Sequence, residues 1–389
     1  MSQRPGPAAA HLVVLLTVGV GLVLLLSVQT AHAEGNIVSI TVTVRNGLGE
    51  PLPNANVTAY FSGNGSKVPS TGGMEGSKIT GSNGQAVLKL VNGTSDASYD
   101  ASYQIKVSYF GNILNVIDFD CTTNCPFTSF SVTLNVYHLT IRVRSSSGAD
   151  PVPGALVNVT SSLTDPGAIV TNQPTDSSGN LIVRNLPAGI EYSIAVSYTA
   201  VGNVKVVRSA SITLSAGSTS VDVTLPLYRL SMRVQDMDGN AINGATVELL
   251  KDGNALLSAS SGTDGSVVFK LLPAGTYSRR FKIGTELVGE RRDVVLSGDS
   301  NLGDLMLPVK KLSLLLRSQN DKPLTGFHLT VKLVLDESEY RSASTTTDSV
   351  DLGYVRADRD YTVRVLFEGH TVYEGRLRGD DVRTNLPLG

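Results

Sequence analysis

Tryptophan is absent from this chain of 389 residues, and only two cysteines and five histidines occur. Without tryptophan, the chain lacks the largest aromatic platforms on which a bound sugar could stack. Charged residues make up only 17% of the sequence and the net charge is −2, which excludes the basic surface that nucleic-acid binding requires. These shortages already favour a protein without nucleic-acid partners.

Residues that carry catalysis are equally scarce. Beyond residue 33 the only histidines are His138, His328 and His370, and none stands in an H-E-x-x-H arrangement. No G-x-S-x-G elbow and no G-x-x-x-x-G-K-[ST] phosphate loop occurs. We therefore predict no enzyme activity, no cofactor and no metal, and we interpret His138 as an interface or edge residue.

The N-terminus predicts export. An uncharged apolar run from Leu12 to Val28 leads to Ala31-His32-Ala33, a small-x-small sequence typical of a signal peptide cleaved after Ala33. The run is also near the lower length limit of a transmembrane helix, so an uncleaved anchor at 1–33 is the alternative. Either reading places the rest of the chain in an extracellular or cell-surface location.

Abundant glycine and Val, Leu and Ile alternating with Thr or Ser favour strands over helices, and the alternation repeats. Four segments begin with an alternating run, at Ile40, Leu139, Leu230 and Leu312. After a polar turn, each continues into a second alternation, in three copies through a proline: Pro51-Leu52-Pro53, Pro151-Val152-Pro153, Ala241-Ile242-Asn243 and Pro323-Leu324-Thr325. Four copies of one structural unit are therefore expected.

The second half of each copy carries hairpin signals. Asp176-Ser177-Ser178-Gly179 and Asp264-Gly265 precede alternating runs, and Leu-Pro-Ala-Gly follows at 186–189 and 272–275. Tyr192 and Tyr277 come next, and we expect them at the sandwich edge. Strand signals at this spacing predict an all-β fold of tandem seven-stranded, immunoglobulin-like (prealbumin-like) β-sandwich domains. The predicted limits are 37–136, 137–227, 228–308 and 309–389, with almost no linker between them.

The motifs G-x-P-h-x-G-A-x-V, T-D-x-x-G-x-h-x-h and L-P-A-G-x-Y, where h is an apolar residue, resemble those of carboxypeptidase regulatory-like and Cna B-type sandwich domains. The resemblance is good in the second and third copies, partial in the first and weaker in the fourth, where Arg356-Ala357-Asp358-Arg359-Asp360 replaces Leu-Pro-Ala-Gly. It implies a spacer or adhesive module of a secreted surface protein. It does not imply peptidase activity, because the metal-binding catalytic domain of such carboxypeptidases has no counterpart here.

Two kinds of covalent modification are predicted. Cys121 and Cys125 are close enough for a small disulfide-closed loop in an exported chain. N-glycosylation sequons begin at Asn56, Asn64, Asn92 and Asn158, three of them in the first copy, and glycans there would hydrate exposed sheet.

Two further sites are open alternatives. The oxygen-rich sequence Asp236-Met237-Asp238-Gly239-Asn240 could bind calcium, although the other copies lack these carboxylates and no EF-hand spacing is present. The resemblance to Cna B-type domains also implies a candidate amide bond from Lys310 or Lys311 to Asn385. A polar turn and surface lysines are the simpler interpretations.

The sequence favours a non-enzymatic extracellular structural protein, a rod-like stalk or a subunit of a surface layer, pilus or filament. An adhesin-like module that binds carbohydrate or a protein partner is the alternative. The expected partners are further copies of the chain or other surface proteins, and glycans in the second case. Contact with a membrane is expected only through an uncleaved N-terminal segment.

Overall fold

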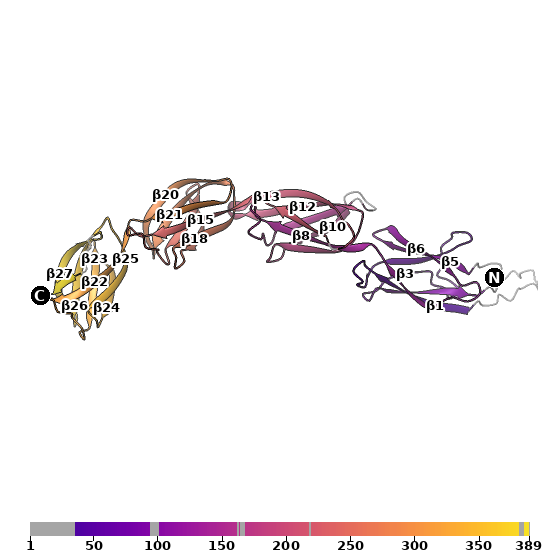
Figure 1. Cartoon of the computed structure of the whole chain (residues 1–389), viewed down its shortest axis with the longest axis horizontal. Coiled ribbons are helices and arrows are strands. Elements are labelled where there is room, and N and C mark those ends of the chain that lie inside the picture. The colour runs from indigo at the N-terminus through magenta and orange to yellow at the C-terminus, as the bar shows by residue number, and fades with distance from the viewer. Residues whose placement is uncertain are drawn as a thin grey trace, which may run out of the picture.

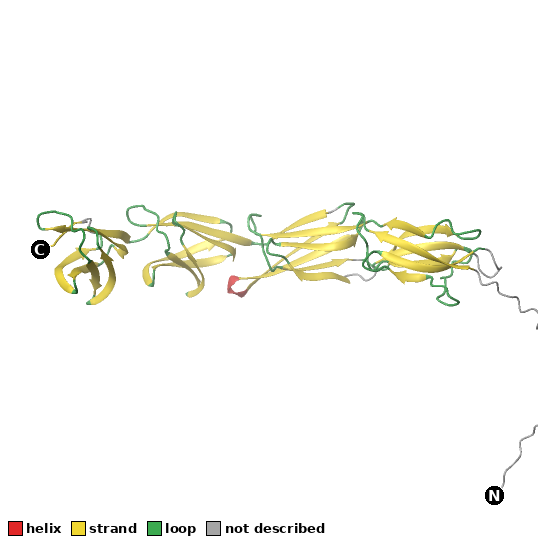
Figure 2. Ribbon diagram, turned by 90° about the horizontal axis from the view of Figure 1, so that it is seen from below, coloured by secondary structure: helices red, strands yellow, loops and turns green. Residues whose placement is uncertain are grey.

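The computed structural model describes residues 36–93, 101–161, 163, 168–217, 219–380 and 385–388. The predicted signal or anchor segment at 1–33 lies outside these residues. Four β-sandwiches follow one another in a row, as Figure 1 shows, and a view from a second direction shows the same line (Figure 2). The short 3-10 turn η1 (Val201–Asn203) is the only helical element in the described part of the chain.

We call the sandwiches units 1 to 4. Unit 1 contains β1 (Asn36–Arg45), β2 (Asn56–Phe61), β3 (Ser77–Ile79), β4 (Gln85–Asn92), β5 (Ser102–Tyr109), β6 (Asn112–Asp120) and β7 (Ser129–Thr133). Unit 2 contains β8 (Val136–Arg144), β9 (Leu156–Ser161), β10 (Ala168–Pro174), β11 (Asn180–Pro187), β12 (Glu191–Ala200), β13 (Val204–Thr213) and β14 (Thr219–Thr224).

Unit 3 contains β15 (Leu227–Gln235), β16 (Thr246–Lys251), β17 (Asn254–Ser260), β18 (Ser266–Pro273), β19 (Gly275–Ile283), β20 (Glu286–Leu296) and β21 (Ser300–Met306). Unit 4 contains β22 (Val309–Ser318), β23 (Leu329–Leu335), β24 (Ser338–Thr345), β25 (Ser349–Arg356), β26 (Asp360–Phe367), β27 (His370–Arg378) and β28 (Asn385–Leu388).

All four units have one topology. Each consists of a three-stranded and a four-stranded sheet, with the orders β4-β1-β7 and β3-β2-β5-β6 in unit 1. The first strand of every unit pairs antiparallel with the fourth and parallel with the seventh. The chain is therefore all-β, as predicted, and is built of tandem β-sandwiches.

Alternating side chains build the cores. In β1, Ile40, Val42 and Val44 are fully buried while the residues between them are half-buried, the period-2 pattern of a strand with one covered face. The same positions in the other units are also buried in separate apolar clusters: Leu139, Ile141 and Val143; Leu230, Met232 and Val234; Leu312, Leu314 and Leu316. Each unit therefore has its own core.

One tyrosine per unit ties the two sheets together. Its hydroxyl donates to a main-chain carbonyl at the end of the fourth strand, in the pairs Tyr103 to Val91, Tyr192 to Pro187, Tyr277 to Pro273 and Tyr361 to Arg356. These tyrosines are at most 1% exposed. The expectation that they pack at the sandwich edge was wrong: the rings are core residues, and each phenolic hydroxyl finds a partner, as buried tyrosines require.

Candidate functional site at the junctions between units

One backbone contact recurs at every junction. The loop after the first strand of a unit, which we call its first loop, donates an N–H to the carbonyl of the residue that begins the next unit's first strand. The pairs are Gly47 to Val136 at 2.9 Å, Ser146 to Leu227 at 3.0 Å and Met237 to Val309 at 3.0 Å. Because these three donors occupy equivalent positions, the junction is itself a repeated element.

The accepting residues also pack into the core of the preceding unit. Val136, Leu227 and Val309 are fully buried, and their side chains pack in the apolar core of the unit before them. Only two residues separate the last strand of one unit from the first strand of the next, for example Thr133 from Val136. So short a connection with a buried anchor leaves little freedom for bending.

The junction of units 1 and 2 adds a polar cluster. Glu50 Oε2 lies 2.9 Å from His138 Nε2, and Asn46 donates from Nδ2 to both Glu50 and Asn185. The Asn185 N–H donates to His138 Nδ1, which leaves Nε2 as the nitrogen that donates to Glu50. The hydrogen bond from Asn46 lowers the pKa of Glu50, and His138 and Arg184 lower it further.

Gly47 makes this junction possible. A Cβ at Gly47 would lie 2.2 Å from the ring of Tyr137, a distance that no side chain tolerates. The ring of Tyr137 therefore occupies the space that any other residue at position 47 would need. Ser146, which is the equivalent residue in unit 2, has a Cβ, so this restriction belongs to the first junction alone.

The junction of units 2 and 3 contains the most buried charge cluster. Asp150, whose side chain is 4% exposed, accepts two hydrogen bonds from Arg229, at 2.7 and 3.1 Å, and lies 3.2 Å from Lys270 Nζ. The hydrogen bond from Arg229 is the main cause of the lowered pKa of Asp150. A two-pronged guanidinium–carboxylate pair fixes direction as well as distance. Unit 3 is therefore held in one orientation on unit 2.

The junction of units 3 and 4 also contains an ion pair, formed by different residues. Lys310 Nζ lies 3.3 Å from Asp238, and the Tyr354 hydroxyl donates to the carbonyl of Ala241. On the other side of the junction, the Tyr340 hydroxyl donates to Glu286. Burial and Glu286 both raise the pKa of Tyr340, so this hydroxyl stays protonated.

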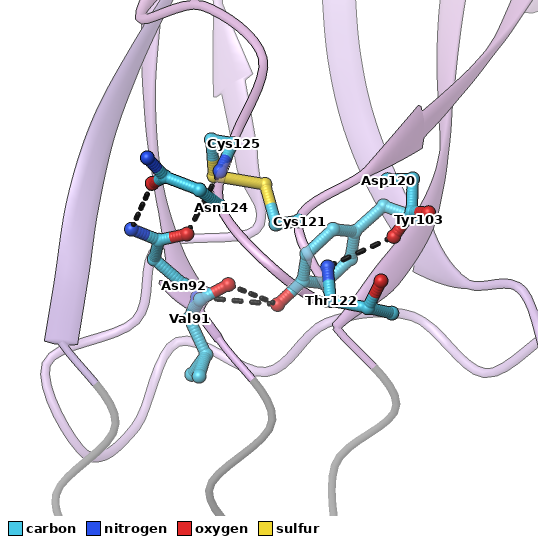
Figure 3. Close-up of a disulfide and its surroundings, with 8 residues drawn as sticks. All are labelled: Val91, Asn92, Tyr103, Asp120, Cys121, Thr122, Asn124 and Cys125. Atoms are coloured by element: carbon cyan, nitrogen blue, oxygen red, sulfur yellow. Dashed lines mark hydrogen bonds between the residues drawn. A yellow bond between two sulfur atoms is a disulfide. The ribbon is translucent and has the colours of Figure 1, made fainter.

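Cys121 and Cys125 form a disulfide at the end of unit 1. As Figure 3 shows, the loop that they close is held by Asn92, whose Oδ1 accepts from the Cys125 N–H and whose Nδ2 donates to Asn124. The Tyr103 hydroxyl lies beside it, bonded to Val91. The disulfide therefore braces the β4–β6 end of unit 1 and does not reach a junction.

The predicted sequon asparagines differ in their surroundings. Asn56 and Asn64 are exposed, on β2 and on the loop after it, whereas Asn92 is half-buried and engaged by the disulfide loop. Asn158 is half-buried on β9, and its Oδ1 has no hydrogen-bond partner. It borders a shallow trough of small side chains on β9, β12 and β13, among them Thr160, Ser193, Ser209 and Ser211.

The alternative sites of the sequence analysis have other roles in the structure. Asp236 Oδ1 accepts the N–H groups of Asp238 and Asn240, which makes this sequence a closed polar turn. Lys310 pairs with Asp238 and Lys311 with Asp351, while strand register places Asn385 opposite Leu315, several residues away from both lysines. Among the described residues no group of three or more His, Cys, Asp and Glu could hold a metal ion.

Of the three histidines, only His138 is part of a junction; His328 and His370 are exposed on unit 4. The pair of Asp150 and Arg229 was not anticipated, because the two residues lie 79 positions apart and no motif surrounds either. The described residues include no helix long and apolar enough to cross a membrane.

No protein-family model and no curated protein sequence matches the chain significantly. Solved structures with similar stretches include the Bacillus anthracis TIE protein, at 12% identity and a TM-score of 0.23, covering 96% of this chain and 78% of that one. The shaft pilin SpaA from Lactobacillus rhamnosus GG matches at 11% identity and a TM-score of 0.27, covering 44% and 97%. A streptococcal ancillary pilin matches at 11% and 0.24, covering 70% and 98%. Likeness at this level does not transfer a function to this chain.

Proposed function

We propose that this chain is a non-enzymatic structural protein outside the cytoplasm, a rod-like stalk or a subunit of a surface filament. The observation that carries the proposal is the junction: one backbone hydrogen bond and one buried apolar residue recur three times. A module that only displays a binding site does not need its neighbours aligned in this way. A rod that holds its ends apart does.

Side-chain pairs across the junctions support the same interpretation. Every junction joins a carboxylate of one unit's first loop to a base at the start of the next unit: Glu50 with His138, Asp150 with Arg229, and Asp238 with Lys310. Such pairs restrict rotation about the long axis, which the backbone contact alone leaves free. We infer that the units behave mechanically as one body.

Small-angle scattering of the secreted chain, together with negative-stain electron microscopy, tests this proposal. We expect an elongated particle, several times longer than wide, with four beads in line and little variation in bend. A compact particle, or four beads joined at variable angles, would contradict the proposed role.

We also propose that the segment 1–33 is a signal peptide and that Asn56 and Asn64 are the preferred glycan acceptors, because both are exposed. N-terminal sequencing of the secreted protein should begin at Glu34, and enzymatic deglycosylation should lower its mass. A retained N-terminal segment would favour the anchor instead. Asn56→Gln with Asn64→Gln should remove most of the mass change.

A second candidate function is a module that binds carbohydrate or a protein partner. One observation favours it: the trough on unit 2, lined by the hydroxyl and amide groups of Asn158, Thr160 and Ser193. Glycan-array screening of the secreted chain tests it. Binding that is lost on Ser193→Tyr, which fills the trough, would support this role beside the structural one.

A further inference from the structure

The two ends of the rod carry the two unmatched halves of the junction. At the unit 1 end, Ile37 lies three residues before the first core residue of its strand, Ile40, as Val136, Leu227 and Val309 do in theirs. Those three are 0% exposed, but Ile37 is 41% exposed. Ile37 is therefore at the position of a junction anchor, and its side chain is exposed in this structure.

At the other end, no described residue of a further unit contacts the first loop of unit 4. Its residues 318–322 include Gln319, which stands at the position of Gly47, Ser146 and Met237. Within the described ranges, the N–H of Gln319 has no acceptor. This is the donor that each of the other units uses to bind its neighbour.

A pocket lies beside this donor. It has a volume of ≈ 370 Å³ and is lined by Leu324, Phe327, Phe367 and Val372, together with residues of the first loop. Leu324 is half-buried, whereas its equivalents Leu52, Val152 and Ile242 are fully buried. In units 1 to 3, the anchor residue of the next unit belongs to the same buried apolar cluster as these three residues.

Unit 4 has enlarged the apolar area of this end. Phe327 replaces an alanine that is at most 1% exposed in the other units: Ala55, Ala155 and Ala245. Those alanines lie under a hydroxyl that bonds their N–H, from Thr80, Thr175 and Ser261. The phenylalanine is 50% exposed, and its ring lies 6.0 Å from that of Phe367. The pocket is thus rimmed by aromatic side chains facing outward.

We propose that the rods associate head to tail, with Ile37 of one copy seated in the Phe327 pocket of a second copy and the Gln319 N–H donating to the Ile37 carbonyl. The occupant is a second copy because all three internal junctions join these same two surfaces, and the described residues leave both of them open. A contact between two different surfaces that does not close on itself produces an open filament. The inference rests on the proposed structural role and names the interface through which it would act.

This contact differs from the internal junctions in its charges. The position of His138 and Arg229 is held in unit 1 by Ser39, so this contact lacks the base of those two internal junctions. Its described part is mainly apolar, with one backbone hydrogen bond. Its association is expected to depend on concentration and to survive high salt, because apolar contact provides most of it.

Sedimentation velocity of the full secreted chain over a range of concentrations tests the proposal. The wild type should form chains of increasing length, and Ile37→Asp or Phe327→Ala should each raise the concentration for half-association about tenfold or more. Both changes fall on exposed side chains, and Phe327→Ala restores the residue of the other units, so folding should be kept. Val295→Asp, at a 70% exposed apolar side chain of β20, is the matched control and should associate like wild type.

Mixing the two variants gives the decisive measurement. The Phe327→Ala protein retains Ile37 and the Ile37→Asp protein retains the pocket, so the mixture should form dimers with one contact and nothing longer. A wild type that stays monomeric, or association that persists in either variant alone, would overturn the proposal. Scattering from the monomeric variants separates the two ideas: an elongated monomer leaves the structural role intact, whereas a compact one contradicts it.

Discussion

The junctions on either side of unit 2 use the same backbone contact with different side chains. Asp150 is 4% exposed and bonded twice by Arg229, whereas the side chain of Glu50 is 51% exposed and shares a single contact with His138. Because an exposed hydrogen bond to a neutral imidazole contributes little and a buried ion pair resists disruption, the two junctions have unequal strength. The backbone hydrogen bond therefore aligns neighbouring units, and the side-chain contacts determine how strongly each junction resists disruption.

Removing the buried carboxylate should have the largest effect. Asp150→Ala leaves Arg229 and Lys270 without their partner, and we expect about 2 kcal/mol less stability, below the usual cost of breaking a buried pair because both bases are partly exposed. Calorimetry should show a lower transition temperature, and scattering a wider range of bend. Glu50→Ala is the matched control, and its loss of stability should be clearly smaller because this carboxylate is exposed to solvent. Equal losses would contradict the comparison.

A second change breaks the first junction without touching its charges. Gly47→Ala places a methyl group against the Tyr137 ring, and we expect a loss of about 1–3 kcal/mol as the ring is displaced. Ser146→Ala, at the equivalent position, keeps both the Cβ and the N–H and should leave the stability unchanged. The fluorescence anisotropy of a dye on unit 1 should report the added mobility, and unchanged anisotropy in Gly47→Ala would count against a fixed junction.

Low pH should weaken the junction of units 2 and 3 over a pH range set by Asp150. The pKa of Asp150 is lowered in the folded state from its ordinary value of 3.8, so its contribution is fully present above about pH 4 and is lost as the pH falls through the lowered folded value. The difference in unfolding free energy between wild type and Asp150→Asn should therefore be constant near neutral pH and become smaller in acid. Urea unfolding at a series of pH values measures this difference, and a difference that grows in acid would contradict the assignment.

The sequence predicted the all-β sandwich fold well because strand alternation and turn residues are local signals. The alternation from Ile40 to Val44 specifies which face is buried, and it does so in every copy. The junction side chains could not be predicted in the same way. Asp150 meets Arg229 and Glu50 meets His138 only after two folded units have been brought together, and the carboxylate occupies a different place in each first loop.

Two expectations show where local patterns mislead. The tyrosine after Leu-Pro-Ala-Gly was expected at the sandwich edge, but its ring lies in the core, where a main-chain carbonyl accepts from its hydroxyl. The amide bond from Lys310 or Lys311 to Asn385 was implied by the resemblance to Cna B-type domains, with the lysines in the opening strand of unit 4 and Asn385 near its final strand. Parallel register separates them along the strand, which sequence position does not reveal.

The parallel pairing of first and last strands in each unit has a mechanical consequence. A pull along the rod draws the start of β1 and the end of β7 in opposite directions, so their five register pairs are loaded in shear and must fail together, not one by one. Among the pairs that the structure describes, unit 2 opposes the pull with six between β8 and β14, and unit 3 with five between β15 and β21. Under tension, unit 2 is therefore expected to outlast units 1 and 3.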